Sequence, residues 1–350
     1  MKENNTLKAG ITIGDMNGVG PEIILKSFLD KRMLDFCTPI IYASSKSLEF
    51  FKNHFQYNIS INKIKTPKEA LNNQINVIEC WKETPRVNFG KTDSEIGKHA
   101  FISLRNATKD LSNNKIDIMI TAPINKKSVQ SDQFSFPGHT EYLNKEFNGN
   151  ALMLMVSNQL RICTVTTHIP INDVSKKITK ESVGNKISIL TKTLIEDFNI
   201  SKPKIAVLGL NPHAGDGGLL GSEENEILTP LIKEMADNGA LVFGPYSADG
   251  FFGSSQQESF DAILAMYHDQ GLIPFKTLSF GQGVNYTGGL DKIRTSPDHG
   301  VAYEIAGKGI ADETSFKEAI FLALATFKNR TEHAQLIEGA IKEEKTLKTK

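Results

Sequence analysis

Short apolar runs alternate along the chain with stretches in which apolar residues recur every three or four positions. Runs such as Ile75–Glu79, Ile116–Thr121 and Asp261–Tyr267 are brief and apolar enough to be strands buried on both faces. The longer periodic stretches predict amphipathic helices, for example one from Ser94, as its N-cap, to Leu111. Strands that alternate with helices predict an α/β protein.

The same patterns predict the remaining elements. Strands are expected at Gly10–Ile13, Pro39–Ala43, Lys204–Leu210 and Leu241–Gly244, and helices from Pro21, from about Phe136–Glu141, over Val183–Phe198, from Ser222 to about Asp237, and over Phe316–Phe327. Two further strands, Ala151–Val156 and Leu160–Thr167, are separated by only a few residues and should form a hairpin. Because a hairpin is antiparallel, the predicted sheet is mixed.

A chain of 350 residues is long enough for two domains with sizeable cores. We expect a first, discontinuous domain of residues 1–130 with 300–350, and a second domain of residues 131–299. The cleft between them would be lined by the loops that follow the strands, and we expect the functional site there.

Three of the predicted strands lead into a histidine, at His168, His213 and His268, and Gly271 is expected to turn the chain after the last of them. In open α/β sheets, ligands bind at the carboxyl ends of the strands. Three imidazoles at such ends can converge on one metal ion and leave positions open for substrate. A lone histidine after a strand is more often a surface or capping residue, so it is the repetition that favours ligation.

The Gly-rich stretch Gly209–Gly218 is a second candidate for ligand binding. Gly permits backbone conformations and close approaches that other residues do not, and a loop of this kind before a helix can hold an anion. Glu223 and Glu224, expected in the first turn of that helix, would repel one. The stretch is therefore as compatible with a neutral part of a cofactor, or with a plain long turn, as with an anion site.

Arg294 and Lys276 are the cations with the most suggestive surroundings. An Arg fork suits a carboxylate or phosphate, and a Lys provides a mobile point charge, although each alone is more often a solvated surface residue. Together with Asn285 and the adjacent His139 and Thr140, they indicate a small, anionic, hydroxylated substrate held beside the metal.

Charge and cysteine content narrow the class of protein. Lys plus Arg and Asp plus Glu both number 40, so the formal net charge is zero, which argues against nucleic-acid and membrane-surface binding. The 3 Cys form no C-x-x-C pair and are expected to be reduced core thiols of a cytoplasmic protein. No run approaches about 18 apolar residues, and the polar residues 1–9 lack the apolar core of a signal peptide, so we expect no membrane segment.

A set of motifs spread over nearly the whole chain resembles one known family. In order they are TAPINKKS, FPGHTEYL, TTHIP, GLNPHAGDGG, GPYSADGFF, AMYHDQGLIPFK and GVNYTGGLDKIRTSPDHG. They are similar to those of 4-hydroxythreonine-4-phosphate dehydrogenase of pyridoxal phosphate biosynthesis. The resemblance implies two α/β/α domains flanking a cleft, as in isocitrate and isopropylmalate dehydrogenases. It also implies a homodimer whose active site lies at the subunit interface.

The same resemblance assigns roles to individual residues. It implies that His168, His213 and His268 bind a divalent metal (zinc, with magnesium or cobalt as substitutes), one of them reaching in from the partner subunit. The substrate contacts that it implies are His139, Thr140, Lys276, Asn285 and Arg294. NAD or NADP is expected without a Rossmann fingerprint, which agrees with the run Gly14–Glu22 not being G-x-G-x-x-G, and no cofactor-binding residue is identified.

The implied reaction is the NAD(P)-dependent oxidation of 4-phosphooxy-L-threonine (4-hydroxythreonine 4-phosphate) to 2-amino-3-oxo-4-phosphooxybutanoate, which decarboxylates to 3-amino-2-oxopropyl phosphate. Asp249 and His139 are both candidates for the general base, and Lys276 is the third expected catalytic residue. Relatives with the same motifs oxidise threonate or erythronate 4-phosphate, which is the first alternative. A metal hydrolase with three histidines and a non-catalytic sugar-phosphate binding protein are the others.

Overall fold

The computed structural model describes residues 6–347, with side chains up to Ala340, and forms two compact units. Unit 1 contains the described residues up to Ala151 together with Val284–Leu324, and unit 2 contains Leu152–Gly283 together with the described residues from Ala325. The expected domains, residues 1–130 with 300–350 and residues 131–299, change at other points. One of these differences arises because residues 284–299 contain two strands that extend the sheet of unit 1.

Seven strands form the sheet of unit 1. Their order is β3 (Ile61–Ile64), β4 (Ile75–Glu79), β2 (Thr38–Ala43), β1 (Lys8–Thr12), β5 (Ile118–Thr121), β12 (Arg294–Pro297) and β11 (Val284–Leu290). Every pairing is parallel except that of β11 with β12. The central strands are wholly buried, which explains why their sequences read as unbroken apolar runs.

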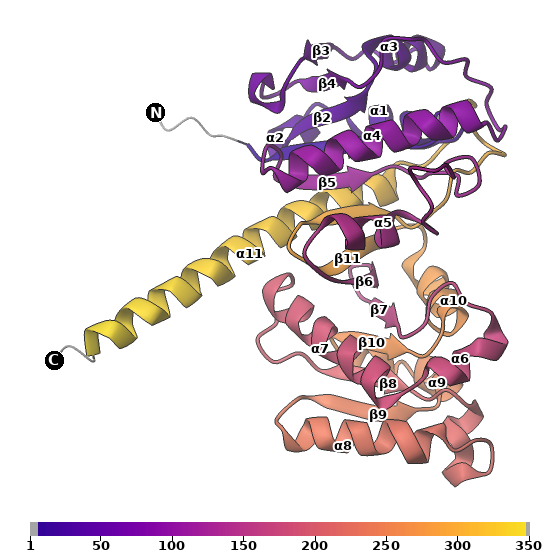
Figure 1. Ribbon diagram of the computed structural model, residues 1–350, viewed down its shortest axis with the longest axis vertical. Helices are drawn as coiled ribbons and strands as arrows, with labels where there is room; N and C mark the ends of the chain where they lie inside the picture. Colours follow the sequence, from indigo (N-terminus) through magenta and orange to yellow (C-terminus); the bar gives the residue numbers. More distant parts are fainter. Residues whose placement is uncertain (1–5, 348–350) are drawn as a thin grey trace. The chain divides into compact units, whose positions relative to one another are not determined.

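Helices cover this sheet. They are α1 (Gly20–Ser27), α2 (Met33–Phe36), α3 (Ser45–His54), the short 3₁₀ turn η1 (Pro67–Glu69), α4 (Ser94–Ser112), α5 (His139–Glu146) and the first part of α11 (Thr314–Leu347). α4 packs against β1, β2 and β5 and crosses one face of these strands in Figure 1. On β12, Thr295 Oγ1 donates a hydrogen bond to the Ala319 carbonyl of α11, 2.8 Å away.

The N-cap predicted for α4 was wrong by one residue. Asp93 is the cap, because its backbone is extended and its carboxylate accepts a hydrogen bond from the Glu95 N–H at 2.8 Å. Ser94 is already the first helical residue. Pro21 lies in the first turn of α1 as predicted, where its missing N–H leaves no bond unmade.

The strands of unit 2 are arranged in a mixed sheet. The order is β6 (Gly149–Val156, from Leu152 on in this unit), β7 (Arg161–Thr164), β10 (Ala262–Ala265), β8 (Ile205–Leu208) and β9 (Val242–Tyr246). β6 and β7 are antiparallel, which confirms the predicted hairpin, and the other pairs are parallel. The predicted α/β class with a mixed sheet is therefore confirmed.

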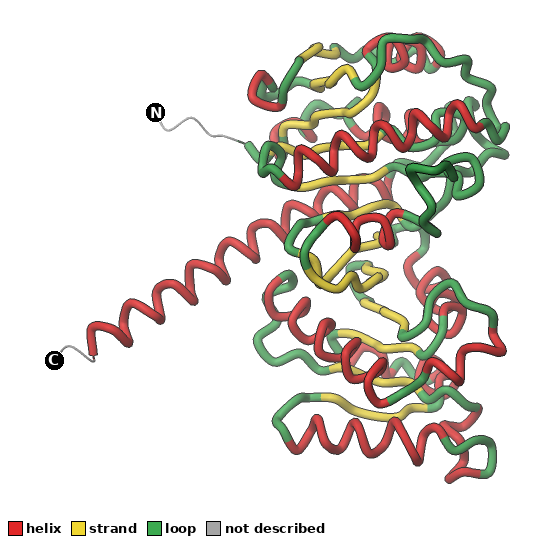
Figure 2. Tube along the Cα trace, in the orientation of Figure 1, coloured by secondary structure: helices red, strands yellow, loops and turns green. Residues whose placement is uncertain are grey.

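The helical segments of unit 2 lie between these strands in the chain. They are α6 (Ile171–Lys177), α7 (Lys180–Glu196), the turn η2 (Pro212–Gly218), the π-helical turn η3 (Glu224–Leu228), α8 (Thr229–Asp237), α9 (Ala248–Gly253), the 3₁₀ turn η4 (Gln256–Ser259) and α10 (His268–Ser279). The second part of α11 also belongs to this unit, and Figure 2 shows α11 as one uninterrupted helix. Within residues 6–347, no helix is both long and apolar enough to cross a membrane.

Gly271 does not turn the chain, contrary to the expectation, but lies inside α10. A Cβ on it would approach Ile162 Cγ2 to 2.9 Å and Ala265 Cβ to 3.2 Å. The missing side chain thus lets α10 pack directly on β7 and β10.

Two helical glycines give opposite expectations for substitution by Ala. In α4, a Cβ on Gly97 would lie 2.0 Å from the Ser128 carbonyl oxygen, and backbone cannot yield as a side-chain tip does. In α7, a Cβ on Gly184 would meet Leu231 Cδ1 at an ordinary 3.6 Å. We expect Gly97→Ala to lower the free energy of unfolding by about 1–3 kcal/mol. Gly184→Ala should raise it by up to about 1 kcal/mol through helix propensity. Urea unfolding measures both, and a stable Gly97→Ala protein would contradict the close packing.

Candidate active site

The three predicted strand-end histidines follow neighbouring parallel strands of unit 2. β10 pairs in parallel with β7 on one side and with β8 on the other. His168, His268 and His213 therefore come after the carboxyl ends of three adjacent strands and at the same edge of the sheet, which is where ligands bind in sheets of this type.

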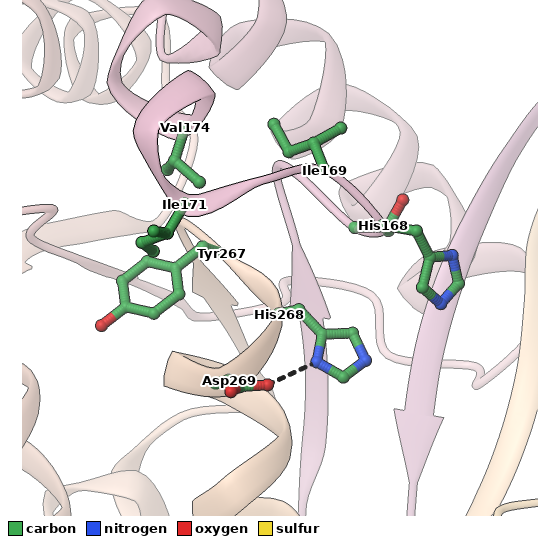
Figure 3. A pocket seen from close by; sticks show the side chains of 8 residues that line it. His168, Ile169, Ile171, Val174, Tyr267, His268 and Asp269 are labelled. Carbon is green, nitrogen blue, oxygen red and sulfur yellow. Dashed lines mark hydrogen bonds and ion pairs between the residues drawn. The ribbon is translucent and has the colours of Figure 1, made fainter.

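Two of these histidines lie close together. The ring centroids of His168 and His268 are 5.6 Å apart, and both rings line a pocket of about 380 Å³. Figure 3 shows the two imidazoles side by side. The remaining lining residues are Thr167, Ile169, Ile171, Val174, Tyr267 and Asp269.

Asp269 orients one of the two imidazoles. Its Oδ1 lies 2.7 Å from Nδ1 of His268, the contact drawn as a dashed line in Figure 3. This contact leaves Nε2 of His268 available to a ligand, and a carboxylate behind an imidazole is the usual support of a metal-binding histidine. The donor set thus suits part of a zinc or cobalt site, for which imidazole is a preferred ligand.

His213 does not line this pocket. Among residues 6–340, no group of three or more His, Cys, Asp or Glu side chains is close enough to hold a metal ion. Within the described part of one chain, the structure thus brings together two of the three expected ligands. Ligation by all three stays a prediction.

His213 lies in an unusual backbone segment. His213, Ala214 and Asp216 all have left-handed dihedrals, with φ of 51°, 50° and 44°, as do Gly215 and Gly217 between and after them. A left-handed conformation costs about 1–2 kcal/mol for each residue that carries a Cβ. The Gly content indicated such backbone for this loop, but not that His213 itself would adopt it.

Asp249 stands near His213 at the start of α9, and its carboxylate is exposed. The hydrogen bond from Ser247 Oγ and, to a lesser extent, that from the Gly250 N–H lower the pKa of Asp249, and the charge of His213 adds to this effect. The carboxylate is therefore ionised at neutral pH.

Lys276 also lies in unit 2, exposed on α10. Eight residues separate it from His268, which corresponds to about 12 Å along the helix axis. The structure therefore does not bring the Lys276 backbone and the pocket of His168 and His268 together within this unit.

The other predicted residues belong to unit 1, where Arg294 is the central one. Its side chain is 2 % exposed and extends from β12 between the flanking strands. Nε and Nη2 donate to Thr121 Oγ1 of β5, at 3.0 and 2.7 Å, and Nη1 donates to Thr287 Oγ1 of β11, at 3.1 Å. Burial lowers the pKa of Arg294 to about 9, so the guanidinium remains charged at neutral pH.

His139 and Thr140 begin α5. The His139 residue keeps some exposed surface, but its Nε2 is inaccessible to solvent and has no hydrogen-bond partner among the described residues. Burial, reinforced by the positive charges of Arg294 and Lys126, holds the pKa of His139 well below its usual value. The imidazole is therefore neutral at pH 7.

Oδ1 of Asn285, on β11, is likewise buried and has no hydrogen-bond partner in the part of the chain that the structure describes. In folded proteins nearly all buried polar atoms are hydrogen-bonded, and exceptions often mark places where a ligand binds. Arg294, His139 and Asn285 thus offer one cation and two unsatisfied polar atoms to a ligand.

Lys126 is a candidate that the residue-by-residue analysis missed. Its charge acts on His139, and its Cε lies 3.8 Å from where a Cβ on Gly138 would be. Lys126 follows the carboxyl end of β5, so the strand-end rule that identified the histidines would have identified it too.

Comparisons with known proteins agree on one family. The model of the pyridoxal phosphate biosynthetic protein PdxA matches residues 35–323. A 4-hydroxythreonine-4-phosphate dehydrogenase of Bacteroides thetaiotaomicron is 50% identical over 330 residues, which cover 94% of this chain and 91% of the relative. A D-threonate 4-phosphate dehydrogenase of Cupriavidus necator is 39% identical over 316 residues, covering 89% of this chain and 94% of that one. The crystal structure of a 4-hydroxythreonine-4-phosphate dehydrogenase from Burkholderia phymatum aligns with a TM-score of 0.76 at 37% identity, covering 92% of this chain and 99% of that one.

The depressed pKa of His139 predicts a specific loss of stability in acid. Below about pH 6.5, the unfolded chain binds a proton at this histidine that the folded protein does not bind. The free energy of unfolding therefore decreases as the pH falls, by up to about 1.4 kcal/mol per pH unit for one proton. His139→Gln should remove this contribution, so its stability relative to wild type should rise between pH 6.5 and 5. Chemical unfolding at several pH values measures it, with His333→Gln as control, and parallel curves for wild type and His139→Gln would refute the neutral, buried state.

Proposed function

The chain belongs to the family of the pyridoxal phosphate biosynthetic protein PdxA, and on this basis we propose that it oxidises 4-phosphooxy-L-threonine to 2-amino-3-oxo-4-phosphooxybutanoate. The reaction is that of a dehydrogenase, with a nicotinamide as hydride acceptor, either NAD or NADP. The product is a β-keto acid, so it loses carbon dioxide readily to give 3-amino-2-oxopropyl phosphate. These products serve pyridoxal phosphate biosynthesis.

The observation that carries the proposal is the buried charge of Arg294. Its hydrogen bonds go to two threonine hydroxyls, and no salt bridge with a carboxylate is seen among the described residues, although the charge of Glu141 partly offsets the effect of burial. A buried charge that no carboxylate contacts directly is destabilising unless a ligand supplies the partner. A phosphate or carboxylate of the substrate does so, and the planar guanidinium is shaped for such a group.

The other residues of unit 1 would orient the same substrate. Nε2 of His139 and Oδ1 of Asn285 can pair with its hydroxyl and amine groups, since neither atom has a partner among the described residues. Thr140, next to His139 at the start of α5, adds a hydroxyl. Lys126 would add a second positive charge near Arg294's anionic ligand.

Unit 2 would supply the metal ligands, His168, His213 and His268. A bound divalent ion, zinc with magnesium or cobalt as substitutes, would lower the pKa of the substrate hydroxyl and stabilise negative charge on its oxygen. The hydroxyl proton would go to Asp249, which is ionised at neutral pH, or to His139, which is neutral, and the carbon-bound hydrogen leaves as hydride. Both bases remain candidates.

We further propose a homodimer in which α10 serves the partner's site. Ile273, Leu278 and Phe280 on and after this helix are exposed, Ile273 by 63% and Phe280 by 85%. Apolar side chains gathered on one helix are what a subunit contact covers. His268 and Lys276 lie on that helix, so a partner would receive a metal ligand and a cation from it. The three free thiols, none of them exposed, suit a cytoplasmic protein.

D-threonate 4-phosphate is the second candidate substrate, since one relative of 39% identity carries that name. The anionic group of this substrate would also bind at Arg294. The two substrates differ at the carbon that bears the amine in 4-phosphooxy-L-threonine. Turnover measured with each compound shows which of the two is the better substrate.

Purified protein should reduce NAD or NADP with 4-phosphooxy-L-threonine, and more slowly with threonate or erythronate 4-phosphate, as read by absorbance of the reduced nicotinamide. Arg294→Lys should lower kcat/KM by at least about tenfold, because a point charge does not replace a bidentate fork. Arg161→Lys, at a partly buried arginine of unit 2 that no step of the proposal uses, is the control and should keep activity. Phosphate release without nicotinamide reduction would instead identify a hydrolase.

The shared site is tested by mixing two inactive variants. His168→Ala and His268→Ala should each be inactive as homodimers. If His268 acts in the partner's site, exchanged heterodimers carry both defects in one site and none in the other, so up to about half of the wild-type activity per heterodimer should return. A mixture that remains at background, with subunit exchange verified by mass spectrometry, would show that each chain builds its own site.

A further inference from the structure

Glu224 is a buried carboxylate that no step of the proposed reaction uses. Its side chain is at the start of η3, and the residue is 2 % exposed. Oε1 accepts hydrogen bonds from the backbone N–H groups of Leu210 and Asn211, at 2.7 and 2.8 Å. Oε2 accepts one from Nδ2 of Asn211, at 2.9 Å. The carboxylate thus binds two backbone N–H groups at the end of β8, as an anion would.

Glycines make room for this carboxylate. A Cβ on Gly215 would lie 2.7 Å from Oε2 of Glu224, and a Cβ on Gly209 would lie 3.1 Å from Oε1. Both distances are shorter than ordinary contacts. The sequence was compatible with three interpretations of the Gly-rich loop: an anion site, a cofactor contact or a plain turn. In the structure, the loop encloses a carboxylate of the chain itself.

The segment that Glu224 holds leads directly into His213. Leu210 and Asn211 are bound to the carboxylate, Pro212 follows, and the left-handed stretch begins at His213. Within that stretch, two residues after His213, Gly215 is packed against the same carboxylate. His213 is therefore fixed from both sides by one buried group, in a backbone conformation that residues with a Cβ rarely adopt.

We propose that Glu224 is the positioning residue of His213: it holds the loop in the left-handed conformation that presents this imidazole to the divalent metal. The inference rests on the proposed function, since it takes His213 as a metal ligand. Groups that orient a metal ligand without touching the metal commonly change metal affinity by 10- to 100-fold when they are replaced.

The test compares Glu224→Gln with Glu226→Gln in the full-length protein. Gln is close to Glu in size and keeps one acceptor oxygen, but it lacks the charge and presents an NH₂ group to Asn211 Nδ2, also a donor. Glu226 is exposed two residues away, so its replacement changes the net charge equally without touching the loop. Zinc alone is the probe, and its affinity is measured by competition with a colorimetric chelator.

We expect Glu224→Gln to bind zinc 10- to 100-fold more weakly and Glu226→Gln to bind it like wild type. The Leu210 and Asn211 amides should exchange with deuterium faster in Glu224→Gln only. Excess zinc should restore turnover, which it would not do if the substitution merely unfolded the protein. In cobalt-loaded protein, the visible absorption of Glu224→Gln should also differ from that of wild type.

Other outcomes overturn the inference in distinguishable ways. Equal zinc affinity of Glu224→Gln and wild type would refute the positioning role while leaving the metal site intact. A wild-type protein that binds no zinc, cobalt or magnesium would refute the metal site itself and the inference with it. Should Glu224→Gln not fold, Glu224→Asp makes the same comparison, because the shorter side chain keeps the carboxylate but withdraws it from the Leu210 and Asn211 N–H groups.

Discussion

The parallel pairing of β10 with both β7 and β8 is the constraint on which the site of unit 2 depends. Because these three strands run in the same direction, the segments after them emerge at one edge, and each begins with or soon reaches a histidine. Gly271 also helps to place His268. The absence of a side chain lets α10, whose first residue is His268, lie directly on the strands. The closeness of His168 and His268 follows from the register and packing of segments a hundred residues apart.

Unit 1 contains buried polar and charged groups whose burial lowers the stability of the folded protein. Among the described residues, Arg294 is charged, buried and hydrogen-bonded to threonine hydroxyls, while Nε2 of His139 and Oδ1 of Asn285 are buried without a hydrogen-bond partner. Each such group reduces the stability of the folded protein. The proposed substrate, with an anionic group and several hydroxyl or amine groups, would supply a partner for each of the three residues.

The Gly-rich loop before η3 also encloses a buried charged group, the carboxylate of Glu224. Backbone N–H groups that converge at the end of a strand commonly bind phosphate or carboxylate. Here the chain places its own carboxylate, Glu224, at that point and packs glycines around it. Glu224 thus ties down Leu210 and Asn211 without a ligand, and under our proposal the loop serves to present His213.

What the sequence determined by itself was local. Apolar runs and helical periodicity identified the strands, the hairpin and the α/β class, because burial on one or both faces of an element leaves its period in the chain. The predicted strands also led to the three strand-end histidines, the chemistry of their side chains singled out Arg294 and Lys276, and motif order identified the family.

Only the tertiary structure determined the properties that depend on backbone dihedrals or on contacts between segments far apart in the chain. Asp93 rather than Ser94 caps α4 because its backbone is extended, and Gly271 lies inside α10, where a side chain would collide with Ile162 and Ala265. The sequence likewise did not determine whether Glu224 repels an anion or acts as one. It also did not determine whether Arg294 is solvated or buried, or which histidines lie close together. These properties arise when residues far apart in the chain are brought together, and no local periodicity records which neighbours a side chain will acquire.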